Sequence, residues 1–223
     1  MNKAIFYKEW LKTRYYFLAA SIVFICYTLY LVIRLNNVVE LRGADHLWSI
    51  LLTRDTIFLE PLQYIPLITG FLMGLVQFIP EVIQKRMKLT LHLPYPREKM
   101  LLMMTLAGLV QLLPLFIVQI VVFAGFFQGF LATELIDHIL LTILPWYIAG
   151  ITAYIWAFAI CLEPTWKMRT LLLLTGLGVV RIHFMLDVPE AYNSFFLWLF
   201  LYGIVGITLI LRSMYRFKEG CQD

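Results

Sequence analysis

Long uninterrupted runs of apolar residues constrain this chain more than any other feature. A helix needs about 20 apolar residues to cross a hydrocarbon core of roughly 30 Å. Such runs occur at residues 15–33, 61–80, 100–130, 139–161, 170–186 and 194–211. Only 14% of the residues are charged, against about 25% in soluble proteins. The sequence therefore predicts an all-α integral membrane protein with six transmembrane helices in a single domain, residues 1–223.

The positions of the basic residues predict the orientation in the membrane. Short cytoplasmic loops collect Lys and Arg, and 14 of the 18 lie at the two ends of the chain and in the loops after the second and fourth runs. Both termini are therefore expected in the cytoplasm, with the chain in the cell inner membrane and with no nucleic-acid partner. Residues 1–14 mix basic and aromatic side chains and are expected to form an N-terminal interfacial helix. An ordinary basic flank is the alternative.

The segment 81–99 is the longest of the expected cytoplasmic connections and is strongly basic. Winding residues 81–93 as a helix places Glu81, Lys85 and Lys88 in one polar stripe. The two prolines near the end of the segment stop any such helix. The pattern predicts a short amphipathic helix at the cytoplasmic interface. A loop that is basic only because the positive-inside rule makes it so is the alternative.

This segment closes with residues 90–97, TLHLPYPR, directly before a long apolar run. The ending, the six runs and the expected cytoplasmic termini together resemble the permease subunits of ABC-2 type transporters. Members of that family have an interfacial N-terminal helix and a coupling helix between spans two and three that ends in a pattern like Leu-x-x-Leu-Pro-x-x-Arg. The family pattern has Gly-Thr further upstream, where this chain has Lys85-Arg86.

The resemblance implies that the chain is the transmembrane permease subunit of an ATP-driven exporter. A separate ABC ATPase, present in two copies, would bind ATP and Mg, dock on the segment and move the spans as rigid bodies. A second permease chain, identical or a sibling, would complete the pathway. The expected substrate is lipid-like, a peptide or another hydrophobic molecule. The residues implied in ATPase coupling are Glu81, Val82, Ile83, Lys85, Arg86, Met87, Lys88 and Arg97.

The chain carries no catalytic pattern of its own. Gly-x-x-x-x-Gly-Lys-Ser/Thr does not occur, and no glycine precedes a lysine. The four histidines lie on separate segments without a ligand-spaced partner, so no metal site is expected. The three cysteines fall within the membrane or on its cytoplasmic side, where no disulfide is expected. We therefore expect no enzyme activity and no cofactor in this chain, with ATP hydrolysis in a partner subunit.

Polar residues within the spans are candidates for a translocation path or gate, because they are costly in lipid. Gln111 and Gln119 lie eight residues apart, close to one helical face. They would alternatively bond neighbouring helices. Arg181 and His183 follow only 11 apolar residues after Arg169. Either the fifth span is short and Arg181 extends to the outer headgroups, or this region is partly re-entrant and gates the path.

A different class of protein fits the same sequence. A non-transport membrane scaffold or assembly subunit would also be a helical bundle whose basic cytoplasmic helix docks another protein. An intramembrane enzyme is disfavoured, because the acidic residues lie almost entirely in loops and no catalytic motif occurs in a span. Stoichiometric association with an ATPase separates the transporter from the scaffold.

Overall fold

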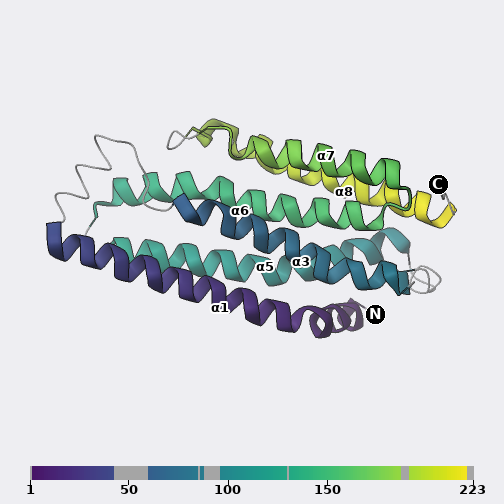
Figure 1. Ribbon diagram of the computed structural model, residues 1–223, viewed down its shortest axis with the longest axis horizontal. Helices are drawn as coiled ribbons and strands as arrows, with labels where there is room; N and C mark the ends of the chain where they lie inside the picture. Colours follow the sequence, from purple (N-terminus) through teal and green to yellow (C-terminus); the bar gives the residue numbers. More distant parts are fainter. Residues whose placement is uncertain are drawn as a thin grey trace.

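The computed structural model describes residues 2–42, 60–84, 86–87, 96–129, 131–186 and 191–219, and every element within them is helical. In chain order the elements are α1 (Asn2–Arg42), η1 (Glu60–Gln63), α3 (Tyr64–Ile83), α5 (Arg97–Phe127), α6 (Thr133–Leu162), α7 (Trp166–Ile182), η2 (Asn193–Phe195) and α8 (Phe196–Glu219). The long helices run side by side along the longest dimension of the molecule (Figure 1). The described part of the chain is therefore an all-α bundle, as the sequence predicts.

Five helices are long and apolar enough to cross a membrane, namely α1, α3, α5, α6 and α8. Their outward faces carry large apolar side chains, such as Ile22 and Val118, each 61% exposed. Soluble proteins rarely expose extended apolar surface of this kind, so these features indicate a multi-pass membrane protein. The remaining predicted run, 170–186, corresponds to α7, whose 17 residues rise only about 26 Å.

The centre of the bundle is α6. It packs against α3, α5, α7 and α8, and it is the most deeply buried of the five long apolar helices. Glycines let α3 and α6 approach closely, as is common between membrane helices. A Cβ at Gly70 would overlap the Gly150 carbonyl oxygen, and a Cβ at Gly74 would lie 2.6 Å from the Ala157 Cβ. α3 and α6 thus form a closely packed pair within the bundle.

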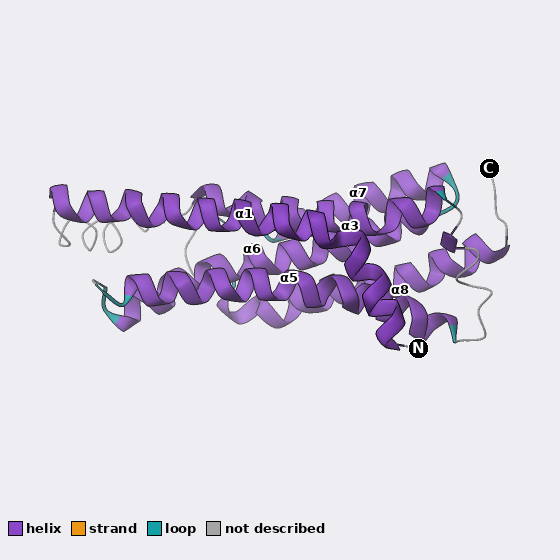
Figure 2. Ribbon diagram, turned by 90° about the horizontal axis from the view of Figure 1, so that it is seen from below, coloured by secondary structure: helices purple, strands orange, loops and turns teal. Residues whose placement is uncertain are grey.

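The first helix, α1, packs along α5 and α3. The sequence predicts a short interfacial helix at residues 1–14 and a separate span, whereas α1 is one helix of 41 residues. Its first turns run at a steep angle to the rest (Figure 2). The Thr13 hydroxyl donates back to the Glu9 carbonyl oxygen at 2.8 Å, a bond that bends helices without interrupting them. The expected boundary after residue 14 is therefore not a break, because α1 continues through it.

The ends of α3 and α5 also differ from the predicted boundaries. α3 passes through Pro80 and ends three residues later, so residues 81–83 of the predicted amphipathic helix belong to an apolar, membrane-length helix. This last turn is held in place because Glu81 is bonded to α1, as described below. Residues 85 and 88–95 lie outside the described part of the chain. α5 begins at Arg97, three residues before the predicted run.

Candidate functional site

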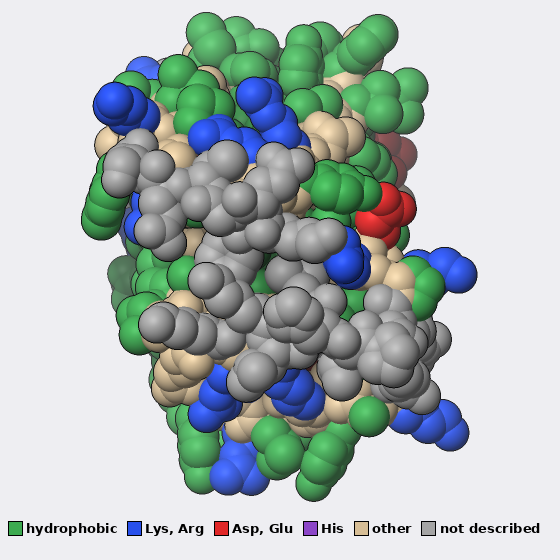
Figure 3. Space-filling view, turned by 90° about the vertical axis from the view of Figure 1, so that its right-hand side faces the viewer, with side chains coloured by type: hydrophobic (Ala, Val, Ile, Leu, Met, Phe, Trp, Pro, Cys, Tyr) green, Lys and Arg blue, Asp and Glu red, His purple; other side chains and the backbone are tan. Residues whose placement is uncertain are grey.

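Both chain termini lie at the same end of the bundle, at the right of Figure 1. α3 ends and α5 begins there too, so the two ends of the segment between them lie at that end. Lys and Arg side chains gather over this face, with few Asp or Glu among them (Figure 3). We call it the basic end; it carries the helix-terminal residues Lys3, Lys8, Arg97, Lys99, Lys167 and Arg212.

A buried cluster of charges joins α1 to α3 at the basic end. The Lys12 ammonium lies 2.8 Å from Glu9 Oε2 and 3.0 Å from Glu81 Oε1, and it donates to the Gln77 carbonyl oxygen at 3.1 Å. Lys8 lies 2.9 Å from Glu81 Oε1. Both carboxylates are fully buried, whereas the Lys8 side chain is 39% exposed. Two acids and two bases thus compensate each other, as buried charges require.

The cluster continues into the bundle through Gln77. Its amide nitrogen donates to Glu9 at 3.0 Å and to the Met104 carbonyl oxygen at 2.8 Å, while its amide oxygen accepts from the Tyr154 hydroxyl at 2.8 Å. Gly108 makes room for this arrangement, because a Cβ there would overlap the Tyr154 hydroxyl and lie 2.5 Å from Gln77 Oε1. A single buried amide therefore connects α1, α3, α5 and α6 in one hydrogen-bond network.

The two glutamines predicted for a translocation path are both buried and bonded between helices. The Thr13 hydroxyl oxygen of α1 lies 2.7 Å from Gln111 Oε1. Gln119 donates to Thr28 Oγ1 at 3.2 Å and accepts from the Tyr147 hydroxyl at 2.8 Å. These contacts agree with the alternative interpretation, in which such glutamines hold neighbouring helices together. Their part in a path stays a prediction.

A second charged cluster joins α6, α7 and α8 at the basic end. Glu163 directly follows α6 and is 2% exposed; its Oε1 lies 3.1 Å from Arg216 Nη1, and its Oε2 accepts from Ser213 at 2.7 Å. Arg169 of α7 donates to the Glu163 carbonyl oxygen at 2.7 Å. The Arg169 guanidinium also lies 4.9 Å from the centre of the Trp166 ring. The short connection from α6 to α7 is thereby held against the end of α8.

Glu81, the first residue predicted for ATPase coupling, belongs to α3 and is buried. Its carboxylate faces α1, where it contacts Lys8 and Lys12, and does not face solvent. The next two residues complete α3, Val82 being half-buried and Ile83 73% exposed. The predicted polar stripe therefore has its acidic member in an internal contact.

The other coupling residues lie on either side of a gap in the described chain. Met87 is buried in the hydrophobic core, and Arg86 is exposed. Arg97 is the first residue of α5. Lys85 and Lys88 lie outside the described residues. The coupling role of this set stays a prediction.

Arg181 and His183 lie at the opposite end of the bundle, where α7 ends. Arg181 is exposed in the last turn of α7, whereas His183 is buried with its Nδ1 3.1 Å from the Val179 carbonyl oxygen. The Tyr192 hydroxyl donates to the Ile182 carbonyl oxygen and closes the turn after α7. None of the four residues predicted for a path or gate lines the apolar pocket between α3, α6 and α7.

The sequence alone did not identify Glu9 and Lys12 as part of a site. Glu9 is the only acidic residue among the first 39, in a stretch rich in Lys and Arg. Its spacing of three from Lys12 places both on one helical face, and Gln77 and Glu81 share a face of α3 at a spacing of four. These spacings indicate two polar helix faces, but they do not indicate that the faces meet.

Ion pairs between helices are concentrated at the basic end. The buried carboxylates there are paired with Lys and Arg side chains of the same chain, which holds helices together. The described residues contain no group of three or more His, Cys, Asp or Glu that could hold a metal ion.

Comparison with known proteins found no family model, no curated protein and no solved structure that matches this chain.

Proposed function

We propose that this chain is the permease subunit of an ATP-driven ABC transporter, with a separate ATPase docking on residues 81–97. The observation that carries the proposal is the buried cluster of charges that joins α1 to α3 at the basic end. The segment begins where α3 ends, and Glu81 in that last turn is paired with Lys8 and Lys12 of α1. A force on the segment would therefore reach α1 and α3 together, which suits a rigid-body movement.

We infer six membrane crossings, made by the five long apolar helices together with α7, and both termini in the cytoplasm. The 17 residues of α7 equal the lower limit for a transmembrane helix, roughly 17 residues. The Lys and Arg side chains gathered at the basic end support a cytoplasmic position for that end. The first turns of α1, which are bent away from the rest, would lie in the headgroup region of the inner membrane.

The transporter that this function requires contains further chains. The sequence has no phosphate-binding loop, so two copies of an ATPase subunit would bind ATP and Mg. A second permease chain, identical or a sibling, would complete a two-fold pathway. A lipid-like molecule, a peptide or another hydrophobic compound is the expected substrate.

Charge reversal in the segment tests this function. The tagged chain is purified from its own membranes in mild detergent, and co-purifying proteins are identified and assayed for Mg-ATP hydrolysis. The wild-type chain is expected to bring down an ATPase with a phosphate-binding loop. The variant K85E/R86E/K88E is expected to lose that ATPase, because the three cations would face acids of the partner.

A matched control separates docking from general charge effects. The variant K3E/K167E/R212E makes the same change in charge at three exposed residues of the basic end, and it is expected to keep the ATPase. Absence of any ATPase from the wild-type preparation would overturn the transporter assignment. Retention of the ATPase by the variant in the segment would overturn the docking assignment and favour a contact elsewhere.

A further inference from the structure

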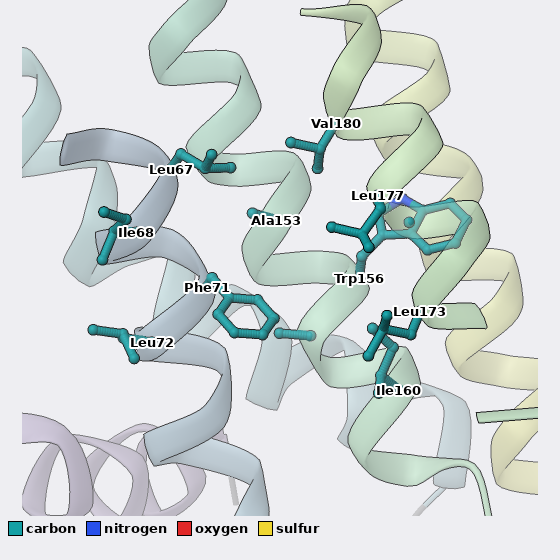
Figure 4. A pocket seen from close by; sticks show the side chains of 12 residues that line it. Leu67, Ile68, Phe71, Leu72, Ala153, Trp156, Ile160, Leu173, Leu177 and Val180 are labelled. Carbon is teal, nitrogen blue, oxygen red and sulfur yellow. The ribbon is translucent and has the colours of Figure 1, made fainter. Parts of the chain in front are cut away.

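An apolar groove opens on the side of the bundle between α3 and α7 (Figure 4). The small side chains of Ala153 and Ala157 on α6 form its floor. Phe71 on α3 and Leu173 and Leu177 on α7 stand on its two walls. The groove has a volume of about 320 Å³, in the lower part of the roughly 300–1,000 Å³ range of ligand pockets.

The groove opens on the side of the bundle between α3 and α7, over α6, so what fills it comes from the bilayer. Both α3 and α6 are long and apolar enough to cross a membrane. Empty space beside apolar side chains forfeits dispersion contacts, which favours an occupant. A single flexible hydrocarbon chain has the right size.

Arg169 does not line the groove itself but lies one helical turn before it on α7, toward the basic end. Arg169 precedes Leu173 by four residues and Leu177 by eight, so it shares the groove-facing side of α7. Its guanidinium lies 4.9 Å from the ring centre of Trp166, and Trp is typical of the headgroup level of a membrane. One guanidinium nitrogen donates to the Glu163 carbonyl oxygen.

The remaining donor capacity of Arg169 is not used up within the bundle. Its Nε is buried and has no hydrogen-bond partner among the described residues. That nitrogen is out of reach of a lipid, but the Arg169 side chain is partly exposed. A phosphate oxygen at its exposed part would form charge-assisted, geometrically matched bonds with the guanidinium.

We propose that this groove binds one acyl chain of an anionic phospholipid whose phosphate is held by Arg169. The groove alone does not discriminate among lipids, because an acyl chain is as apolar as the bilayer that it leaves. Selectivity comes from the charge of Arg169, as in other basic pockets that bind anionic headgroups near a membrane surface. The site belongs to this chain by itself, so it does not depend on the transporter assignment.

Native mass spectrometry tests the phosphate contact. The purified chain is released from vesicles of equal parts phosphatidylglycerol and phosphatidylcholine, and the retained lipids are counted. The wild-type chain is expected to retain one phosphatidylglycerol in preference to phosphatidylcholine. R169Q is expected to lower this preference about fivefold, the effect of one basic group near a membrane surface. K167Q, which changes an exposed lysine two residues away, is expected to keep it.

A second experiment fills the groove by substitution. It leaves in place the hydrogen bond from Arg169 to the α6–α7 connection, which R169Q removes. L173W places an indole over the groove and is expected to lower the retention of both lipids. L174W changes the next residue, which is 67% exposed and does not line the groove, and is expected to retain the lipid. An unchanged lipid preference in R169Q would overturn the phosphate contact. Unchanged lipid retention in L173W would overturn the groove as the site. So would a loss of self-association in L173W without a loss of bound lipid.

Discussion

Replacement of Lys12 by Met removes the cation that two buried carboxylates share. Glu9 and Glu81 are both 0% exposed, and Lys12 lies 2.8 Å from the first and 3.0 Å from the second. Opposite unit charges near 3 Å attract by roughly 5 kcal/mol at an effective dielectric constant of about 20. Much of this offsets the cost of dehydrating the charges. Loss of one partner of a buried pair nevertheless costs about 3–5 kcal/mol, and we expect Lys12→Met to lower the free energy of unfolding by that amount.

The assay is the loss of helical circular dichroism as SDS is titrated into mixed micelles of the purified chain. Lys3→Met removes an exposed cation from the same helix and is expected to stay within about 0.5 kcal/mol of wild type. Adding Glu9→Gln to Lys12→Met neutralises one stranded carboxylate, so it is expected to recover about 1 kcal/mol or more. A loss below about 1 kcal/mol in the single variant, or no recovery in the double variant, would refute the conclusion that buried charges fasten α1 to α3.

Two further substitutions test the packing and the second charged cluster in the same assay. Gly108→Ala is expected to cost about 1–3 kcal/mol, because the new Cβ would overlap the buried Tyr154 hydroxyl. Gly125→Ala on the same helix has nothing within 4 Å, so equal losses in both variants would contradict this packing argument. Glu163→Gln is expected to cost about 1.5–3 kcal/mol, because its buried carboxylate holds an ion pair and a hydroxyl bond from α8. Glu40→Gln alters an exposed carboxylate, and a cost for Glu163→Gln no larger than for this control would count against the second cluster.

The positions of the helices could be predicted because hydrocarbon leaves the backbone few alternatives. Peptide groups in lipid must bond within their own segment, so a long apolar run becomes a helix whatever its neighbours are. The boundaries were less accurate where a tertiary contact extends a helix. α3 passes through Pro80, and Glu81 in the following turn is bonded to α1. Likewise α1 continues through the expected division after residue 14.

The buried cluster of charges between α1 and α3 could not be predicted, although the residues on each of the two helices have a signal in the sequence. Helical spacing shows that Glu9 and Lys12 share one face and that Gln77 and Glu81 share another. The two faces belong to helices 69 residues apart, counted from Lys12 to Glu81. Periodicity describes a face but not what covers it, which is why the sequence placed Glu81 in a stripe toward water or a partner.

The sequence by itself determined an all-helical bundle of membrane-length helices with one strongly basic end. Length, apolarity and charge act on each helix separately, so these properties can be read one segment at a time. Only the tertiary structure decided which polar groups are paired inside the bundle and which residues stand beside the apolar groove. Those outcomes depend on how closely helices approach, and the approach of α3 to α6 is determined by the contact of Gly70 with Gly150.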